Sequence, residues 1–241
     1  MTARGRVADR PPLPDHVVER IRRERHTPRP TQPDYLHLAG LRRALAAAFA
    51  RLPHADGPAL DLYCGTQPYR EMLPRQTVVG VDRDRHFARA DVVADLPLPF
   101  ADGTFSLVLC TQALYLVDDP ARAVREMYRV LAPGAHAVAT VPHVFRREVP
   151  SERRLTAADL RALFAGWDAD VRGFGGVGSG LAYLPSSLAL GAARRWPALR
   201  AVLPPVGLAL SGVGTLLDVS LRPLARRWPA NWIVVARRPA G

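Results

Sequence analysis

A short apolar strand followed at once by a tight glycine turn constrains this chain more than any other feature. Residues 59–65 read ALDLYCG, and residues 78–82 form a second apolar run that ends on the carboxylate of Asp82. Glycine at position 65 lets the backbone approach a ligand, and a carboxylate that closes the second strand can accept hydrogen bonds from both hydroxyls of a ribose. Asp82 lies seventeen positions after Gly65, near the roughly twenty expected for this pairing. The pattern predicts a nucleotide-type cofactor site in an open α/β sheet.

Strand and helix patterns alternate along most of the chain. The helix that follows Asp119 has this residue as its expected N-cap and Pro120 at its first position, and Thr156 with Asp159 forms an expected capping box for another helix. These signals predict a Rossmann-like, doubly wound, mostly parallel seven-stranded sheet with helices on both faces. Expected strands cover residues 59–63, 77–82, 91–94, 105–110, 135–141, 167–173 and 232–237, and further helical spacing covers residues 16–25, 35–52 and 157–165.

The chain's length suits one domain with extensions. Residues 1–34 are rich in Pro and Arg and lack steady periodicity, which predicts a flexible arm before a single domain at 35–241 with its core at 59–142. Residues 174–230 form an apolar insertion before the last strand. A helical cap over the ligand site is the first interpretation, and a membrane-interface surface flanked by arginines is the alternative. The uncharged run 201–217, broken by prolines, is too short for the roughly twenty apolar residues of a membrane span.

The net charge and the cysteine content bear on which partners, metals and cellular location are expected. The net charge of +11 suggests nucleic acid or anionic membrane as a partner, but all 33 basic residues are Arg, which is typical of a GC-rich genome. The two cysteines, Cys64 and Cys110, have no metal-ligand spacing and exclude a Cys-rich zinc site, so no metal is expected. They are typical of reduced, buried thiols, and the Arg-rich N-terminus has no apolar stretch of a secretion signal. The expected location is the cytoplasm, with membrane association as the alternative.

The glycine turn itself discriminates between cofactors. A dinucleotide site uses G-x-G-x-x-G, in which the later glycines admit the pyrophosphate. Here only Gly65 is present, and Gln67 and Arg70 occupy the later two positions. A pyrophosphate would meet these side chains, so a cofactor without phosphate, such as S-adenosylmethionine, is favoured.

Six short motifs follow one another along the chain. They are residues 60–65 (LDLYCG), 79–82 (VGVD), 94–100 (ADLPLPF), 105–134 ending in RVLAPG, 154–156 (RLT) and 231–239 (NWIVVARRP). In this order they resemble the class I S-adenosylmethionine-dependent methyltransferases, specifically the methyltransferase type 11 domain, over roughly half the chain. The resemblance implies S-adenosylmethionine as the cofactor and methyl transfer as the reaction.

The family's roles for the first two motifs carry over to matching residues. Gly65 would give the cofactor access to the backbone, and Asp82 would bind the ribose hydroxyls. Asp61 would organise the glycine turn through backbone N–H groups, with simple turn capping as the alternative.

Roles from the later motifs are implied in the same way. Asp95 and Leu96 would frame the adenine, although turn capping is again an alternative for Asp95. Thr111 and Gln112, at the carboxyl end of the strand that starts at residue 105, would line the floor beneath the transferring methyl.

The chain departs from the family pattern at some positions. Tyr63 and Gln67 stand where glycine is usual, so a narrowed cofactor crevice and a catalytically inactive, membrane-associated relative remain alternatives. Tyr63 has a precedent in certain RNA methyltransferases, which makes RNA another alternative acceptor. The frequent Glu-His pair is replaced here by Tyr115 and Leu116, and His143 is the remaining candidate for a general base, against a solvated loop histidine.

The expected reaction is in-line transfer of a methyl group to a small, apolar molecule, because the apolar insertion would shape an apolar pocket. Nucleic acid is not the expected partner. No N-P-P-Y or P-C dipeptide follows the strand 105–110, and no basic, aromatic-interleaved appended domain is present. Peripheral membrane contact through residues 174–230 is a further expectation.

Overall fold

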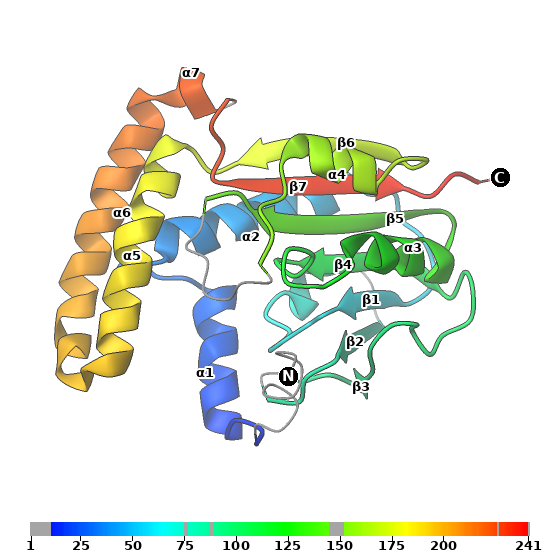
Figure 1. The fold of residues 1–241 in the computed structure, drawn as a ribbon, viewed down its shortest axis with the longest axis horizontal. Coiled ribbons are helices and arrows are strands. Elements are labelled where there is room, and N and C mark those ends of the chain that lie inside the picture. Colours follow the sequence, from blue (N-terminus) through cyan, green and yellow to red (C-terminus); the bar gives the residue numbers. More distant parts are fainter. Residues whose placement is uncertain (1–10, 75–76, 87–88, 145–151, 226, 241) are drawn as a thin grey trace.

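Seven strands form one sheet in the computed structural model, which describes residues 11–74, 77–86, 89–144, 152–225 and 227–240 (Figure 1). The order across the sheet is β3-β2-β1-β4-β5-β7-β6. Strand β7 pairs antiparallel with both of its neighbours, and the other pairs are parallel. This confirms the predicted mostly parallel, doubly wound sheet. The strands are β1 (Ala59–Leu62), β2 (Val78–Asp82), β3 (Val92–Val93), β4 (Phe105–Thr111), β5 (Leu131–Pro142), β6 (Asp168–Phe174) and β7 (Asn231–Arg237).

The order in which the strands are added to the sheet reverses between β1 and β4. The chain runs outward from β1 through β2 to β3, then returns to place β4 on the other side of β1 and β5 beyond it. Such a reversal leaves a crevice beyond the carboxyl ends of the two central strands, where ligands bind in open α/β sheets. The topology therefore places the ligand site beside Gly65, in the turn after β1, and beside Thr111, the last residue of β4.

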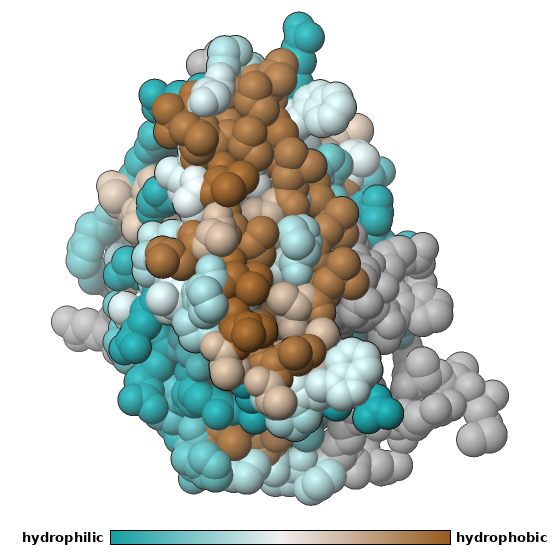
Figure 2. All heavy atoms as spheres, turned by 90° about the vertical axis from the view of Figure 1, so that its left-hand side faces the viewer, coloured by the Kyte–Doolittle hydropathy of each residue, from teal (hydrophilic) through white to brown (hydrophobic). Residues whose placement is uncertain are grey.

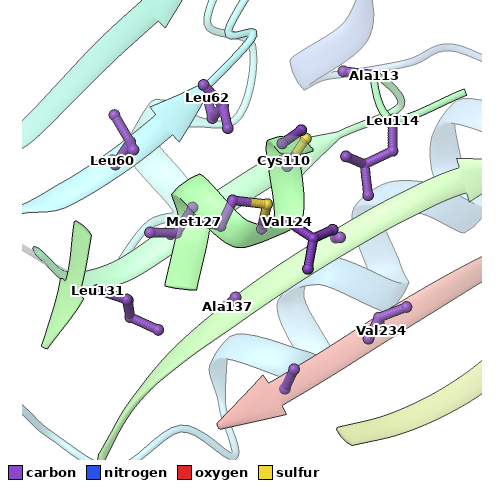
Figure 3. Packing of buried hydrophobic residues seen from close by; sticks show 14 of the residues in the cluster. Leu60, Leu62, Cys110, Ala113, Leu114, Val124, Met127, Leu131, Ala137 and Val234 are labelled. Carbon is purple, nitrogen blue, oxygen red and sulfur yellow. The ribbon is translucent and has the colours of Figure 1, made fainter. Parts of the chain in front are cut away.

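Helices cover both faces of the sheet, as expected. Helix α2 (Tyr35–Phe49) lies on one face, while α3 (Pro120–Val130) and α4 (Ala157–Leu163) lie on the other. Alternate residues of the central strands serve the two sides: Leu60 and Cys110 pack with Met127 of α3 (Figure 3), and their neighbours along the strands pack against α2. Burial on both faces explains why β4 is a continuous apolar run.

The capping residues in the sequence predicted the start of helices α3 and α4 correctly. The Asp119 carboxylate accepts a hydrogen bond from the Arg122 N–H at 2.8 Å, with Pro120 at the first helical position. The Thr156–Asp159 capping box is also present. These bonds satisfy N–H groups that the first turn of a helix would otherwise leave unpaired.

The start of β5 differs from the prediction. The expected strand began at residue 135, after a stop at Pro133 and Gly134, but β5 begins at Leu131. Leu131 already pairs with Phe105, and the register then shifts before the regular ladder resumes. Gly134 has a φ of +76°, which accommodates the irregularity. The turn residues therefore lie within the strand and bend it.

Arg129 of α3 holds the segment that follows β3. Its guanidinium donates hydrogen bonds to the carbonyls of Leu98 and Phe100, at 3.0 and 2.7 Å, and to the Asp102 carboxylate at 2.8 Å. Two further bonds, at 2.9 and 2.8 Å, reach Glu126 on the same helix. This one side chain thus anchors the loop that enters β4.

Replacing Arg129 with leucine should destabilise the protein by about 2–3 kcal/mol, because it leaves partly buried acceptors without a donor. Urea unfolding of the purified variant would measure the loss. Arg125→Leu is the matched control, since Arg125 lies on the same helix and, among the described residues, makes only a long, exposed ion pair to Asp119. Equal stability losses in the two variants would contradict the anchoring role of Arg129.

The apolar insertion is helical, as predicted. It contains α5 (Val177–Arg195), η3 (Pro197–Val202), α6 (Leu203–Ser220) and α7 (Arg222–Ala225). Helices α5 and α6 pack side by side as an antiparallel hairpin beyond the carboxyl ends of the parallel strands (Figure 1).

One helical stretch of this insertion, Pro197–Ser220, is long and apolar enough to cross a membrane by length and composition. The prolines of this region were expected to interrupt it. Instead, Pro204 and Pro205 lie in the first turn of α6, where proline disturbs no hydrogen bond of the helix.

The N-terminal segment includes α1 (Asp15–His26), which lies across the same edge of the sheet. The Leu13 N–H donates to the His86 carbonyl at 3.0 Å, and the His26 ring bonds the Pro68 carbonyl at 2.8 Å. Arg22 pairs with Glu71 of η2 (Arg70–Met72) at 2.7 Å. The flexibility expected for residues 1–34 stays a prediction, and residues 1–10 lie outside the described part of the chain.

Candidate functional site

A cavity of about 1590 Å³ opens at the carboxyl ends of β1 and β4. Its floor is the turn after β1 and the segment 111–116 after β4, and its outer walls come from α1, the start of α2, α5 and the start of α6. Pockets for single small ligands have volumes of about 300–1000 Å³. This cavity therefore has room for a cofactor and an acceptor together.

Most of the predicted site residues meet in this cavity. Asp61, Gly65, Asp82, Thr111 and Gln112 all line it, although they come from three different strands or the turns that follow them. The two-strand pattern of the sequence thus corresponds to one place in the fold.

The remaining two predicted residues lie elsewhere. Asp95 and Leu96 are not among the residues that line the cavity. Asp95 is exposed, and its carboxylate accepts a hydrogen bond from the N–H of the next residue, Leu96, at 2.8 Å. Their role at the adenine stays a prediction.

Asp82 and Gly65 are joined directly. The Gly65 N–H donates to one carboxylate oxygen of Asp82 at 2.8 Å, and the Asp84 N–H donates to the other at 3.1 Å. Burial raises the pKa of Asp82, against these backbone bonds, which lower it. Each oxygen keeps a lone pair for a ligand, so the geometry suits a ribose with two adjacent hydroxyls.

Gly65 faces open space. Its φ is +51°, a conformation that favours glycine, and a Cβ built there would meet no atom within 4 Å. The backbone at this position is consequently bare toward the cavity, as the resemblance requires of a residue that contacts the cofactor.

Asp61 is buried beneath the turn with 3% of its surface exposed. Loss of solvent, followed by the nearby charge of Asp82, raises its pKa to about 7. The Gly65 N–H donates to Asp82 rather than to Asp61, so the expected role of Asp61 in organising the turn stays a prediction. A buried carboxyl at the cavity floor is also suited to accept a hydrogen bond from a bound ammonium group.

Tyr63 and Gln67 both adopt a backbone conformation that favours glycine. Their φ angles are +56° and +50°. Gln67 is buried, and its side-chain amide donates to the Arg89 carbonyl, while its oxygen accepts from Arg70 at 2.6 Å. The glycine at position 80 leaves room for this amide, because a Cβ there would overlap it.

The orientation of these two side chains bears on the width of the crevice. Gln67 is not among the residues that line the cavity, whereas Tyr63 is. Only one of the two departures from the family pattern therefore faces the ligand space.

Three polar atoms around the crevice lack a partner among the described residues. They are the buried Oγ1 atoms of Thr66 and Thr111 and the Nε2 atom of Gln112, and all three residues line the cavity. Buried polar groups without partners are rare in folded proteins and often mark a ligand site. Together with the bare backbone at Gly65, they fit a cofactor that carries both a ribose and a polar amino-acid tail.

Sequence reasoning missed the wall supplied by α2. His37 lines the cavity, and its ring packs against Tyr183 of α5 at a centroid distance of 5.6 Å. Burial, and then the charge of Arg25, lower its pKa to about 4, so its imidazole is neutral at pH 7. His37 precedes Leu41 by one helical turn, which places it on the buried face of α2, and this spacing could have identified it.

His143, the candidate general base, lies just beyond β5. It is half-buried, its ring packs against Trp232 at 5.5 Å, and its Nδ1 has no partner among the described residues. Burial, and then the charge of Arg154, lower its pKa. The cavity is lined by Pro142 but not by His143, and its role as a base stays a prediction.

The chain is similar to several methyltransferases. The methyltransferase domain family Methyltransf_11 matches residues 60–139. A norajmaline N-methyltransferase of Rauvolfia serpentina is 40% identical over 73 residues, which cover 30% of this chain and 25% of that protein. A ubiquinone/menaquinone biosynthesis C-methyltransferase, UbiE, of Desulfotalea psychrophila is 33% identical over 135 residues, covering 44% and 55%. The chain thus spans between a quarter and about half the length of these curated relatives.

Solved structures share the fold. A possible histamine N-methyltransferase of Thermotoga maritima has a TM-score of 0.54 at 17% identity, covering 92% of this chain and 96% of that one. The [4+2]-cyclase SpnF has a TM-score of 0.55 at 20% identity, covering 83% and 81%. At such identities the likeness concerns the fold alone, which does not fix a reaction. Residues 60–139 thus match the Methyltransf_11 family of methyltransferase domains, and the chain shares the fold of these solved structures.

Proposed function

We propose that this protein is an S-adenosylmethionine-dependent methyltransferase that acts on a small, apolar molecule. One observation carries the proposal. The backbone at Gly65 is bare toward the cavity, and its N–H holds the Asp82 carboxylate at 2.8 Å beside that open space. This arrangement lies within the segment matched by the methyltransferase domain family.

The residues at the crevice would divide the work of binding. Asp82 would hold the ribose, and Asp61 and the Thr66 hydroxyl would face the polar amino-acid tail. Thr111 and Gln112 would border the position of the transferring group. When bound, the cofactor supplies a methyl group on a sulfonium, whose leaving group is already excellent. Catalysis by the protein would consist mainly of positioning the acceptor and excluding water.

The size and the far wall of the cavity support a small acceptor. Beyond the crevice, the cavity extends to Leu190 of α5 and to Leu203 at the start of α6. The curated relatives described above are named for small-molecule substrates or for quinone biosynthesis, which supports the same class. We also propose a cytoplasmic location, because Cys64 and Cys110 are both buried free thiols. The exposed apolar side chains of residues 174–230 support peripheral membrane contact.

Calorimetric titration tests the cofactor. We expect one saturable site for S-adenosylmethionine with a Kd of about 1–100 µM, a range common for enzyme ligands. At a hundredfold excess over Kd, the ligand should add about 2.7 kcal/mol to the free energy of unfolding. NAD is the matched control and should give no heat. Binding of NAD, or no binding of S-adenosylmethionine, would refute the proposal.

Transfer itself is tested with a radiolabelled methyl donor. Quinols, phenols and amines of low polarity would be offered alongside bulk tRNA, and the products separated by organic extraction. We expect label in the organic phase. Label that stays with tRNA, or transfer to none of these acceptors by a protein that binds the cofactor, would contradict a small apolar acceptor.

A further inference from the structure

The hairpin of α5 and α6 has its small residues inside and its large apolar residues outside. The buried positions of α6 are Gly207, Ser211 and Gly214, while Leu208 and Leu216 on the same helix are exposed by 57% and 67%. In α5, too, every buried residue is Gly, Ser or Ala. A helix on a water-exposed protein surface shows the reverse arrangement. Small residues at the helix contact and large aliphatic residues facing outward are typical of helices in lipid.

The inner face of the hairpin is already occupied by the protein. A Cβ at Gly178 would overlap the Gly214 carbonyl, so the two helix backbones are in close contact. The Ser211 hydroxyl donates to the Pro30 carbonyl at 2.9 Å, and the Ser186 hydroxyl donates to the Pro33 carbonyl. These contacts hold the face with the small residues against the rest of the domain. The face with the large apolar residues therefore remains on the outside of the molecule.

The exposed apolar side chains form one continuous surface. Among the described residues, every exposed large hydrophobic residue except Val93 lies between residues 181 and 228. Figure 2 shows a band of hydrophobic residues, in brown, along the side of the molecule where the hairpin lies. A surface of this extent on a soluble domain marks an interaction site. We call it the outer hairpin face; it consists of Leu181, Leu184, Leu188, Trp196, Leu199, Val202, Leu208, Val213, Leu216, Val219, Leu224 and Trp228.

The charged residues at the two ends of this face are arginines. Arginines lie at both ends of the hairpin, at 194, 195 and 200 near one end and at 222 and 227 near the other. The only acidic residue between 174 and 230 is Asp218. Its carboxylate accepts hydrogen bonds from the Gly178 and Ser179 N–H groups, at 2.7 and 3.1 Å, and so is engaged at the start of α5.

Two tryptophans complete the pattern. Trp196 lies at the turn between α5 and η3, and Trp228 follows α7 at the opposite end, exposed by 58% and 69%. Tryptophan is enriched where membrane proteins meet the lipid headgroups, and arginine is attracted to anionic lipids. Since the hairpin is fixed along its inner face, it suits the plane of the membrane surface rather than a path across the bilayer.

We propose that the outer hairpin face docks on the surface of an anionic phospholipid bilayer. The hairpin then forms a wall between the membrane and the cavity, to which Leu190 and Leu203 contribute. Docking would thereby bring the cavity close to apolar acceptors dissolved in the bilayer; this last step rests on the proposed function, whereas docking does not.

Vesicle flotation tests docking. Wild-type protein is mixed with vesicles of phosphatidylcholine containing about 30% phosphatidylglycerol, and with vesicles of phosphatidylcholine alone. We expect most of the protein to float with the anionic vesicles and at least about fivefold less with the neutral ones, with a smaller difference at 0.5 M salt. Equal recovery in the two vesicle types, or none in either, would overturn the proposal.

Variants locate the contact. The triple change Leu188→Gln, Leu208→Gln and Leu216→Gln should reduce flotation at least about tenfold, since each removes exposed apolar surface. Val93→Gln is the matched control, because Val93 is also exposed, by 41%, but lies outside the face, and should float like wild type. The double change Arg195→Gln and Arg222→Gln should reduce binding to anionic vesicles and leave the weak binding to neutral vesicles unchanged.

Two measurements separate the alternatives. Thermal unfolding and S-adenosylmethionine binding without vesicles should be the same in the triple variant and in wild type, because none of the changed residues lines the cavity. Failure of cofactor binding in both would refute the proposed function and leave flotation as an independent result. A wild-type dimer that the triple variant converts to monomer, without flotation of either, would show that the face binds a second copy and would overturn the proposal.

Discussion

Replacing Asp82 with alanine should weaken S-adenosylmethionine binding about 100-fold. Two effects add. The variant loses the charged acceptor for the ribose hydroxyls, and hydrogen bonds to charged groups contribute about 1.5–3 kcal/mol each. It also releases the Gly65 N–H, which the carboxylate holds at 2.8 Å, so the turn that presents the backbone loses its support. A loss of about 2.7 kcal/mol corresponds to a hundredfold change in Kd, and calorimetric titration would measure it.

Asp56→Ala is the matched control for this change. The Asp56 carboxylate is fully exposed, and Asp56 is not among the residues that line the cavity. We expect the Kd of this variant for S-adenosylmethionine to change less than about threefold. An Asp82→Ala protein that is folded and binds the cofactor as tightly as wild type would refute the assignment of the ribose site.

The fold and the crevice were predictable because their signals are local. A continuous apolar run indicates a strand buried on both faces, and the Asp119 cap indicates a helix start, without any knowledge of distant residues. The class of the sheet and the helical nature of the insertion were both confirmed. The start of β5 was not predictable, since it depends on the pairing of Leu131 with Phe105 in another strand.

The side chain of Gln67 illustrates a second limit. The sequence shows a large residue at a glycine position and predicts interference with the ligand. Its orientation depends on the Arg89 carbonyl and on space beside Gly80, both contributed by segments that pack there only in the folded protein. A replaced glycine is harmless when the fold provides such a place for the side chain.

The far wall of the cavity shows the same limit at longer range. Residues 20–41 were assigned to an arm and an ordinary helix, yet several of them line the cavity together with α5. Segments about 150 residues apart in sequence meet there, as in the bond from Ser186 to the Pro33 carbonyl. Periodicity identifies which face of each helix is buried, but it does not identify the partner.

Replacing Asp61 with asparagine should stabilise the cofactor-free protein, and more so at higher pH. Burial raises the pKa of Asp61 from 3.8 in its ordinary state to about 7 in the fold. The folded state therefore favours the protonated form, so this side chain costs nothing below about pH 4 and destabilises the protein progressively as the pH rises to about 7. The full cost above that pH is on the order of 4 kcal/mol.

Asparagine has nearly the same shape and no charge, so the variant avoids this cost. Urea unfolding of both proteins at pH 5 and pH 8 would measure it, and we expect the advantage of the variant to be about 2–3 kcal/mol larger at pH 8. Other titrating groups are common to the two proteins and cancel in the comparison. An advantage that shrinks between pH 5 and pH 8 would contradict the raised pKa of Asp61.

Asp159→Asn provides a control of opposite sign. Hydrogen bonds from the Thr156 N–H and hydroxyl lower the pKa of Asp159, so its carboxylate contributes stability above its ordinary pKa that is lost as the pH falls. Its replacement should therefore destabilise the protein at pH 8 and have less effect near pH 3.

A buried carboxyl such as that of Asp61, which destabilises the cofactor-free protein at neutral pH, is retained most simply because the bound cofactor uses it. Asp61→Asn should accordingly gain stability and lose affinity for S-adenosylmethionine, and a variant that gained stability while binding the cofactor unchanged would remove Asp61 from the site.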